Sequence, residues 1–331
     1  MWRKSLDLPE SKPEIAAVRD AANRIRQELA KVVVGQKDVI DQILVAILCE
    51  GHVLLEGVPG IAKTLIARAI ALAISADFAR IQFTPDLMPS DVIGTNVFDP
   101  STGKFSLRKG PIFTGLLLAD EINRTPPKTQ AALLEAMQER SVTIDGKSHA
   151  LDPVFTVLAT QNPIEYEGTY PLPEAQLDRF MLKIIVPYPA YETEVEVLSR
   201  YNSGFSSMRL DEAGVRSAIG RNELLELRKA VSGVFVEQPI VEYIAKIVRR
   251  TRDNRSLVLG ASPRASIWLL LGSKAVAAMN GREFVIPDDV KQLAAPVLRH
   301  RLILRPEAEI EGITHDRVVE STLAEVEVPR Q

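Results

Sequence analysis

Cysteine is almost absent from the chain, histidine is rare and long apolar runs are missing, and each shortage excludes a class of protein. The chain has one cysteine, Cys49, so no disulfide can form within it. The four histidines do not have the spacing of metal ligands. The longest apolar runs, such as residues 43–49, are far shorter than the roughly 18 residues of a membrane span. We therefore expect no disulfide framework, no histidine metal centre and no membrane span.

A marked excess of charge is also missing. The 40 basic and 43 acidic residues give a net charge of −3, which gives no general reason to expect nucleic acid or an anionic membrane as the partner. The N-terminus carries charges with no apolar signal core behind them, so the cytoplasm is the expected compartment. Cys49 ends an apolar run, which indicates a thiol in the core rather than a nucleophile.

What is present is the composition of a globular protein of about two domains. The chain has 331 residues, of which 46% are hydrophobic and 25% are charged. Short apolar segments alternate with helical stretches up to about residue 189. The expected strands are residues 52–56, 79–84, 115–120, 154–160 and 182–186. This alternation predicts an α/β fold with a parallel five-stranded sheet that helices cover on both faces.

Apolar residues at helical spacing predict the helices. One such pattern begins at Glu14, and a second has Val39, Ile43, Leu44, Ile47 and Leu48 on one face. Further helices are expected at residues 64–75, 128–139, 192–201, 221–232, 240–252, 263–279 and 288–299. Because the strand pattern stops after Pro189, we expect an α/β domain at 1–189, with an N-terminal helix and hairpin insertions, and an all-helical domain at 190–331.

Two short segments are predicted to form hairpins outside the main sheet. Residues 96–98 and 104–107 flank a turn of the sequence Asp-Pro-Ser-Thr-Gly. Residues 141–144 lead into Asp145-Gly146, which is a favourable hairpin turn. Either hairpin could contact another protein, or both could be packing elements between subunits.

The strongest local signal is a candidate phosphate-binding loop at residues 57–64, with the sequence Gly-Val-Pro-Gly-Ile-Ala-Lys-Thr. It follows an apolar strand, precedes a helix, and differs from the general phosphate-loop pattern by having Ala62 at the second glycine. Glycines allow backbone N–H groups to face phosphates, and the helix N-terminus attracts the same anion. Lys63 would neutralise phosphate charge and Thr64 would be a ligand of Mg²⁺. The alternative is an ordinary turn with Lys63 in solvent, which the flanking strand and helix disfavour.

A second signal supports the first. The apolar run of residues 115–119 ends in Asp120 and Glu121. At the C-terminal edge of a parallel sheet such carboxylates face the ligand crevice, whereas the alternative is a solvated acidic turn. Asp120 would hold the metal, directly or through water, and Glu121 would activate the attacking water. We find no Asn-Lys-x-Asp segment that would bind guanine, so ATP is the expected nucleotide.

With these two motifs in order, the chain resembles AAA+ ATPases, and among them the MoxR family. The resemblance is carried by residues 118–130, with the sequence Leu-Ala-Asp-Glu-Ile-Asn-Arg-Thr-Pro-Pro-Lys-Thr-Gln, and by residues 133–140. Residues 33–36, 155–163, 173–180 and 260–264 resemble the adenine-pocket box, the sensor 1 strand, the arginine-finger segment and the start of the sensor 2 helix. The likeness covers roughly residues 30–305 and implies a P-loop AAA+ core followed by a helical lid domain.

The resemblance also implies roles for single residues. Asn162 would contact the attacking water or the γ-phosphate, from a strand between the phosphate-loop strand and the strand of Asp120. Arg179 would enter the ATP site of the neighbouring subunit, and Arg264 would extend from the lid over the nucleotide. Arg124 is an alternative candidate for a charge role between subunits. The residues expected to contact the nucleotide are Val34, Gly35, Gly57, Val58, Pro59, Gly60, Ile61, Ala62, Lys63, Thr64 and Leu65.

The function that this resemblance implies is Mg²⁺-dependent ATP hydrolysis that drives the remodelling, maturation or activation of client proteins. A homo-oligomer is expected, with a ring of six as the family's usual form, and a protein with a von Willebrand factor A domain is an expected partner. Two alternatives stay open. One is a nucleic-acid-stimulated motor with basic residues Lys104, Arg108 and Lys109 in its pore, and the other is a nucleotide-gated scaffold with little turnover.

Overall fold

A parallel sheet of five strands forms the centre of the N-terminal part of the chain, as the sequence predicted. In the computed structural model, which describes residues 12–329 except 59, 102, 163–167, 208 and 211, the strand order is β2-β5-β8-β1-β9 and every pair is parallel. The strands are β1 (Val53–Glu56), β2 (Phe78–Gln82), β5 (Leu116–Asp120), β8 (Thr156–Gln161) and β9 (Leu182–Ile185).

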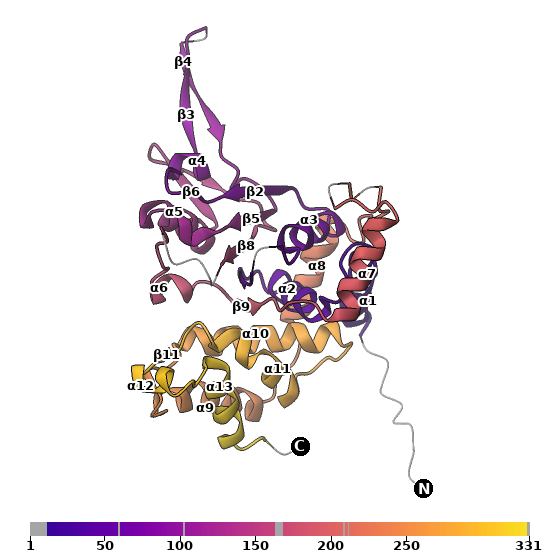
Figure 1. The fold of residues 1–331 in the computed structure, drawn as a ribbon, viewed down its shortest axis with the longest axis vertical. Helices are drawn as coiled ribbons and strands as arrows, with labels where there is room; N and C mark the ends of the chain where they lie inside the picture. The colour runs from indigo at the N-terminus through magenta and orange to yellow at the C-terminus, as the bar shows by residue number, and fades with distance from the viewer. Residues whose placement is uncertain are drawn as a thin grey trace.

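Helices cover both faces of this sheet (Figure 1). Val53 and Leu55 of β1 belong to the core beneath α1 (Pro13–Ala30), α2 (Lys37–Leu48) and α3 (Lys63–Ala73). Leu54 belongs to the core on the other face, beneath α5 (Pro127–Glu139). Successive side chains of a strand point to opposite faces, so a strand buried on both faces is apolar throughout. This is why the strands appear in the sequence as continuous apolar runs.

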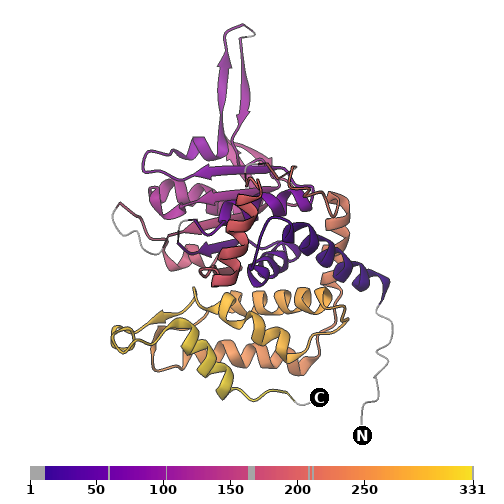
Figure 2. The ribbon, with the colours of Figure 1, turned by 45° about the vertical axis from the view of Figure 1, so that its right-hand side comes forward.

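Both predicted hairpins are present, and the first is longer than expected. Strands β3 (Gly94–Asp99) and β4 (Lys104–Lys109) form an antiparallel pair that follows the short helix α4 (Pro89–Ile93) and projects far from the sheet (Figures 1 and 2). Strands β6 (Ser141–Ile144) and β7 (Lys147–Ala150) form the second hairpin, which lies close against the body of the domain.

The C-terminal part is a helical lid domain, on the side of the sheet away from the β3–β4 hairpin (Figures 1 and 2). Its helices are α9 (Gln238–Arg252), α10 (Pro263–Met279), α11 (Pro287–Leu298), α12 (Pro306–Ile310) and α13 (His315–Glu325). It is not entirely helical, because β10 (Leu257–Leu259) pairs with β11 (Ile303–Leu304). Segments of three and two residues are too short to produce the alternating pattern from which strands are predicted.

Two further helices connect the sheet to the lid. Helix α7 (Tyr191–Asn202) follows β9, and α8 (Arg221–Ser232) packs against α1 and α2. The segment between them is fixed to α3, because the N–H groups of Ala218 and Ile219 both donate to Ala73 O. The division into domains 1–189 and 190–331 stays a prediction. No helix in the described part of the chain is long and apolar enough to cross a membrane.

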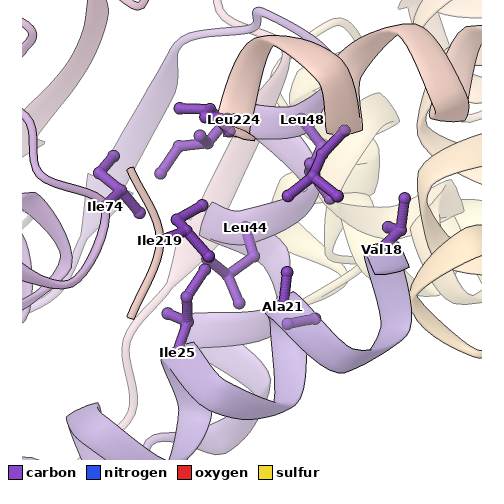
Figure 3. A pocket seen from close by; sticks show the side chains of 11 residues that line it. Val18, Ala21, Ile25, Leu44, Leu48, Ile74, Ile219 and Leu224 are labelled. Carbon is purple, nitrogen blue, oxygen red and sulfur yellow. The ribbon is translucent and has the colours of Figure 1, made fainter. Parts of the chain in front are cut away.

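A small apolar hollow lies where α1, α2 and α8 meet (Figure 3). Its lining includes Val18, Ile25, Leu44 and Leu224, and its volume is about 10 Å³. A hollow of this size has room for at most about one water molecule. It is therefore a packing defect between helices, and a nucleotide site has to lie elsewhere.

The buried histidine His52 joins three elements at the start of β1. Its Nδ1 accepts a hydrogen bond from Val157 N of β8 at 3.0 Å, so its Nε2 carries the proton and donates to Met137 O of α5 at 3.1 Å. Burial, with a smaller contribution from Arg140, lowers the pKa of His52 to about 3. The ring is therefore neutral in the folded chain, and its role is structural.

We predict an acid-sensitive contribution to stability from His52. The pKa is about 3 when folded and about 6.5 when unfolded, so the unfolded state takes up the proton first as the pH falls below 6.5. The free energy of unfolding should drop by about 2 kcal/mol from this source between pH 7 and pH 5. Urea unfolding of His52→Gln should show a pH-dependent drop smaller by that amount, whereas His149→Gln on the β7 surface should match the parent chain. An equal drop in His52→Gln would contradict this.

Candidate nucleotide-binding site

The phosphate-binding loop joins β1 to α3 and has a backbone that few residues can adopt. A Cβ atom on Gly57 would lie 2.4 Å from Ile61 Cδ1 and 2.8 Å from Val186 O, so only glycine fits there. Gly60 has φ +87° and Ala62 has φ +65°, both in the left-handed region. Ala62 therefore takes the conformation for which the general pattern has a glycine, at a cost of about 1–2 kcal/mol. Pro59 lies outside the described residues.

The apolar members of the loop attach it to the core. Ile61 is buried, and Val58 and Leu65 pack against the core cluster beneath α1, α2 and α3. These side chains therefore contribute to the site by fixing the backbone, whose N–H groups are the phosphate-binding element expected of such a loop.

Lys63 and Thr64 are the first two residues of α3, so the N-terminus of this helix meets the loop. Lys63 Nζ donates a hydrogen bond to Gly57 O at 2.6 Å and therefore lies across the loop. A helix N-terminus, a lysine and a hydroxyl together form an anion-binding cradle that also offers one ligand to a cation.

Asp120 ends β5 and is held by two neighbours. Thr160 Oγ1 of β8 donates to Asp120 Oδ1 at 2.6 Å, and Arg80 Nη2 of β2 lies 2.7 Å from Asp120 Oδ2. Thr160 is completely buried, and its oxygen also accepts a hydrogen bond from the backbone N–H of Glu121 at 2.8 Å. One hydroxyl thus fixes both acidic residues of the motif. The sequence did not point to Thr160 or Arg80, because these contacts depend on strand pairing.

Glu121 follows β5 in a left-handed conformation, with φ 58°. Its Oε2 accepts hydrogen bonds from Gln82 Nε2 at 2.7 Å and from Arg124 Nη1 at 2.9 Å. Gln82 ends the neighbouring strand β2, where it is paired with Asp120. These two hydrogen bonds, one of them from a charged guanidinium, hold the Glu121 carboxylate in this position.

Asn162 directly follows β8, which lies between β1 and β5 as the sequence analysis predicted. Asn162 is 6% exposed, and the next residue, Pro163, lies outside the described residues. The C-terminal ends of β1, β8 and β5 therefore bring the phosphate-binding loop, Asn162 and the Asp120–Glu121 pair to one edge of the sheet. This is the edge at which parallel α/β sheets bind ligands.

Val34 and Gly35 lie in the turn between α1 and α2. Gly35 has φ +73°, and a Cβ atom there would lie 2.7 Å from Thr193 Cγ2 of α7. This box is therefore covered by the helix that leads from the sheet to the lid. Such a contact suits residues 33–36, which resemble a segment that lines the adenine pocket, because it places them beside the connection between the sheet and the lid.

Arg179 and Arg264, the two arginines that were expected to be functional, form a second group with Asp178. Helix α6 (Glu174–Leu177) ends just before residues 178–179, and Arg179 Nη1 donates a hydrogen bond to Leu134 O of α5 at 2.7 Å. Arg264, near the start of α10, lies 3.7 Å from Asp178 Oδ2. The structure thus places Arg264 beside the arginine-finger segment. Asp178 was not among the residues expected to be functional.

Family models match both parts of the chain. The model of the ATPase family associated with various cellular activities (AAA) matches residues 52–182. A model of the AAA lid domain matches residues 249–322. The fold, the nucleotide-binding edge of the sheet and these matches define an AAA+ ATPase.

The full-length relatives narrow this class. Protein YeaC of Bacillus subtilis is 48% identical over 92% of this chain and 94% of its own length. Chaperone MoxR1 of Mycobacterium tuberculosis is 41% identical over 96% of this chain and 84% of its own length. A crystal structure from Cytophaga hutchinsonii is 44% identical, with a TM-score of 0.88, and covers 96% of this chain and 97% of its own. The chain belongs to the MoxR family of AAA+ ATPases.

The hydroxyl of Thr160 gives a test of this site. Thr160→Val should lower the kcat for ATP by about 10- to 100-fold, because it removes one hydrogen bond from Asp120 and leaves the Glu121 N–H unpaired. Thr160→Ser keeps the hydroxyl and should retain most of the activity. Steady-state ATPase assays of the two variants check this. Equal activity of Thr160→Val and Thr160→Ser would contradict the role given to the hydroxyl.

Proposed function

We propose that this chain hydrolyses ATP with Mg²⁺ and uses the energy for chaperone-like remodelling, maturation or activation of client proteins. The observation that carries the proposal is the meeting of Lys63, Asp120, Glu121 and Asn162 at the ends of β1, β5 and β8. The name of the relative Chaperone MoxR1, 41% identical, supports the chaperone part.

The residues at this edge fit a magnesium–nucleotide complex. The loop backbone, Lys63 and the N-terminus of α3 would bind the phosphates, and Thr64 and Asp120 would hold the ion. Bound Mg²⁺ would neutralise charge on the phosphates. The carboxylate of Asp120 is part-buried and pairs with Arg80, so its environment suits a negatively charged group that has a cationic partner.

Glu121 would position the attacking water, and Asn162 would donate to that water or to the γ-phosphate. In the present arrangement Gln82 and Arg124 hold the Glu121 carboxylate. We infer that productive binding of ATP releases Glu121 from at least one of them. Arg124 would then take a charge role between subunits.

Arg179 and Arg264 would complete the ATP site of a neighbouring subunit. They share one part of the surface, since Arg264 pairs with Asp178 next to Arg179. We therefore propose that both act across the seam between subunits, which modifies the expectation that Arg264 covers its own nucleotide. A homo-oligomer follows from this proposal, and a hexameric ring is the form that the family resemblance implies. A cytoplasmic location and a partner with a von Willebrand factor A domain belong to the same proposal.

A mixing experiment tests the shared site. Arg179→Ala and Glu121→Gln should each lose ATPase activity alone, Arg179→Ala by about 10³-fold or more. A mixture of the two should recover activity, because the Glu121→Gln chain supplies an intact Arg179 to the intact site of the other chain. ATPase rates before and after mixing, with ATP binding as a control for folding, check this. No recovery in assembled mixtures would refute the shared site.

The β3–β4 hairpin is the surface that we assign to the client. Phe98 and Phe105 pair across the two strands with ring centroids 5.3 Å apart, yet they are 50% and 71% exposed. The β6–β7 hairpin differs, since its apolar residues Val142 and Ile144 are buried in the core. Exposed aromatic pairs are unusual without a partner, and they suit an apolar polypeptide segment.

Replacing Phe98 and Phe105 together by Ser should abolish stimulation of the ATPase by an unfolded polypeptide and leave the basal rate unchanged, since the hairpin projects far from the sheet that carries the site. Replacing Thr143 and Lys147 of the β6–β7 hairpin by Ser is the matched control and should change neither rate. Stimulation by DNA instead, with a steep dependence on salt, would support the nucleic-acid motor and contradict this assignment.

A further inference from the structure

A buried arginine joins the lid to the segment that carries Arg179. The side chain of Arg301, three residues after α11, is 1% exposed. Its Nε donates to Asp178 Oδ1 at 2.7 Å, and its Nη2 donates to Asp178 O at 3.0 Å. Further bonds go to Phe180 O, to Met181 O at 3.2 Å, and to Val297 O near the end of α11. One guanidinium thus fixes the backbone on both sides of Arg179.

The carboxylate of Asp178 is shared among lid residues from two helices. Besides Arg301 it accepts a hydrogen bond from Ser262 Oγ, at 3.1 Å and 3.2 Å from its two oxygens, and it lies 3.7 Å from Arg264 Nη1. Ser262 and Arg264 are at the start of α10, whereas Arg301 follows the end of α11. The start of one lid helix and the end of another therefore meet at the residue that precedes Arg179.

The pair of Arg301 and Asp178 is stable as a charged pair. Burial lowers the pKa of Arg301 to about 10, and the opposite effect of Asp178 limits this decrease, so the guanidinium stays charged at neutral pH. A buried charge without its partner is strongly unfavourable, whereas a buried charge with several hydrogen bonds fixes one geometry. Arg301 and Asp178 therefore hold the lid and the finger segment in one relative position.

We propose that Arg301 is a positioning residue for ATP hydrolysis, which with Asp178 fixes the lid to residues 178–181 so that Arg179 and Arg264 reach the neighbouring subunit's ATP together. This inference rests on the proposed function, because it needs Arg179 to act across a seam. Arg301 itself does not touch the nucleotide. It acts through the backbone on either side of Arg179, so a tilt of the lid moves the finger directly.

A neighbouring arginine provides a matched control. Arg299 also joins the lid to β9, because its Nη1 donates to Lys183 O at 3.0 Å while its guanidinium pairs with Asp316. It makes none of the contacts with residues 178–181. If docking of the lid were all that mattered, changes at Arg299 and Arg301 would have similar effects on hydrolysis.

The test compares Arg301→Lys, Asp178→Asn and Arg299→Lys in ATPase assays of the full chain. Arg301→Lys keeps the charge and loses the several bonds, and Asp178→Asn keeps an acceptor oxygen and loses the charge. Both should lower kcat by about 10- to 100-fold with nearly unchanged binding of a non-hydrolysable ATP analogue, because a misplaced catalytic group costs this much. Mixing either variant with Glu121→Gln should restore activity, as for Arg179→Ala. Arg299→Lys should stay close to the parent rate.

The outcomes separate this inference from the proposed function. If Arg179→Ala is rescued by Glu121→Gln but neither Arg301→Lys nor Asp178→Asn is, the shared site stands and Arg301 is only a structural residue. A parent-like kcat of Arg301→Lys and Asp178→Asn would also overturn the inference. If Arg179→Ala is not rescued, the proposed function fails and the inference fails with it.

Discussion

Parallel pairing of β1, β8 and β5 is the constraint on which the remaining features of the site depend. It makes the C-terminal ends of the three strands meet, so residues about 40 to 100 positions apart in the sequence become neighbours. The hydroxyl of Thr160 shows the effect of this pairing, because it donates to the carboxylate of Asp120 and accepts from the backbone N–H of Glu121. Because the strands are apolar on both faces, their ends are where polar groups can gather without loss of core packing.

The sequence alone was sufficient to predict the elements with strong periodicity and to locate the motif residues on them. The five core strands, both hairpins and the longer helices up to α11 were predicted, because apolar runs and helical spacing reflect burial directly. The short helices α4, α6 and α12, the β10–β11 pair and α13 were not predicted. Elements of two to five residues are too short to show a periodic pattern, and the pattern of α13 is weak. Arg80, Thr160 and Arg301 were not predicted for another reason. Their partners lie 40 to 123 residues away, and no local rule records such contacts.

Two of the six non-glycine residues with a left-handed backbone in the described chain lie where the chemistry is expected. Ala62 and Glu121 both have left-handed backbones, at the phosphate-binding loop and at the acidic turn. Such conformations persist only where the surrounding structure fixes them. Ile61 anchors the first turn in the core, and the bond between the Glu121 N–H and Thr160 fixes the second. The departure of Ala62 from the general loop pattern therefore changes the side chain but keeps the backbone that phosphate binding needs.

In the proposed function, the chain carries two incomplete halves of one site on different parts of its surface. The strand ends would supply the groups that bind and attack the triphosphate, and residues 178–179 with the start of α10 would supply the arginines that another copy requires. The arginine half is fixed to the lid, because Arg301 holds Asp178, while the adenine box is covered by α7, the helix that follows β9 and leads towards the lid. In the proposed assembly, a change in nucleotide that moves the lid would therefore change the position of the arginines offered to the next subunit. Rigid packing and a buried ion pair transmit this movement better than a flexible loop, because a well-packed contact has few intermediate positions.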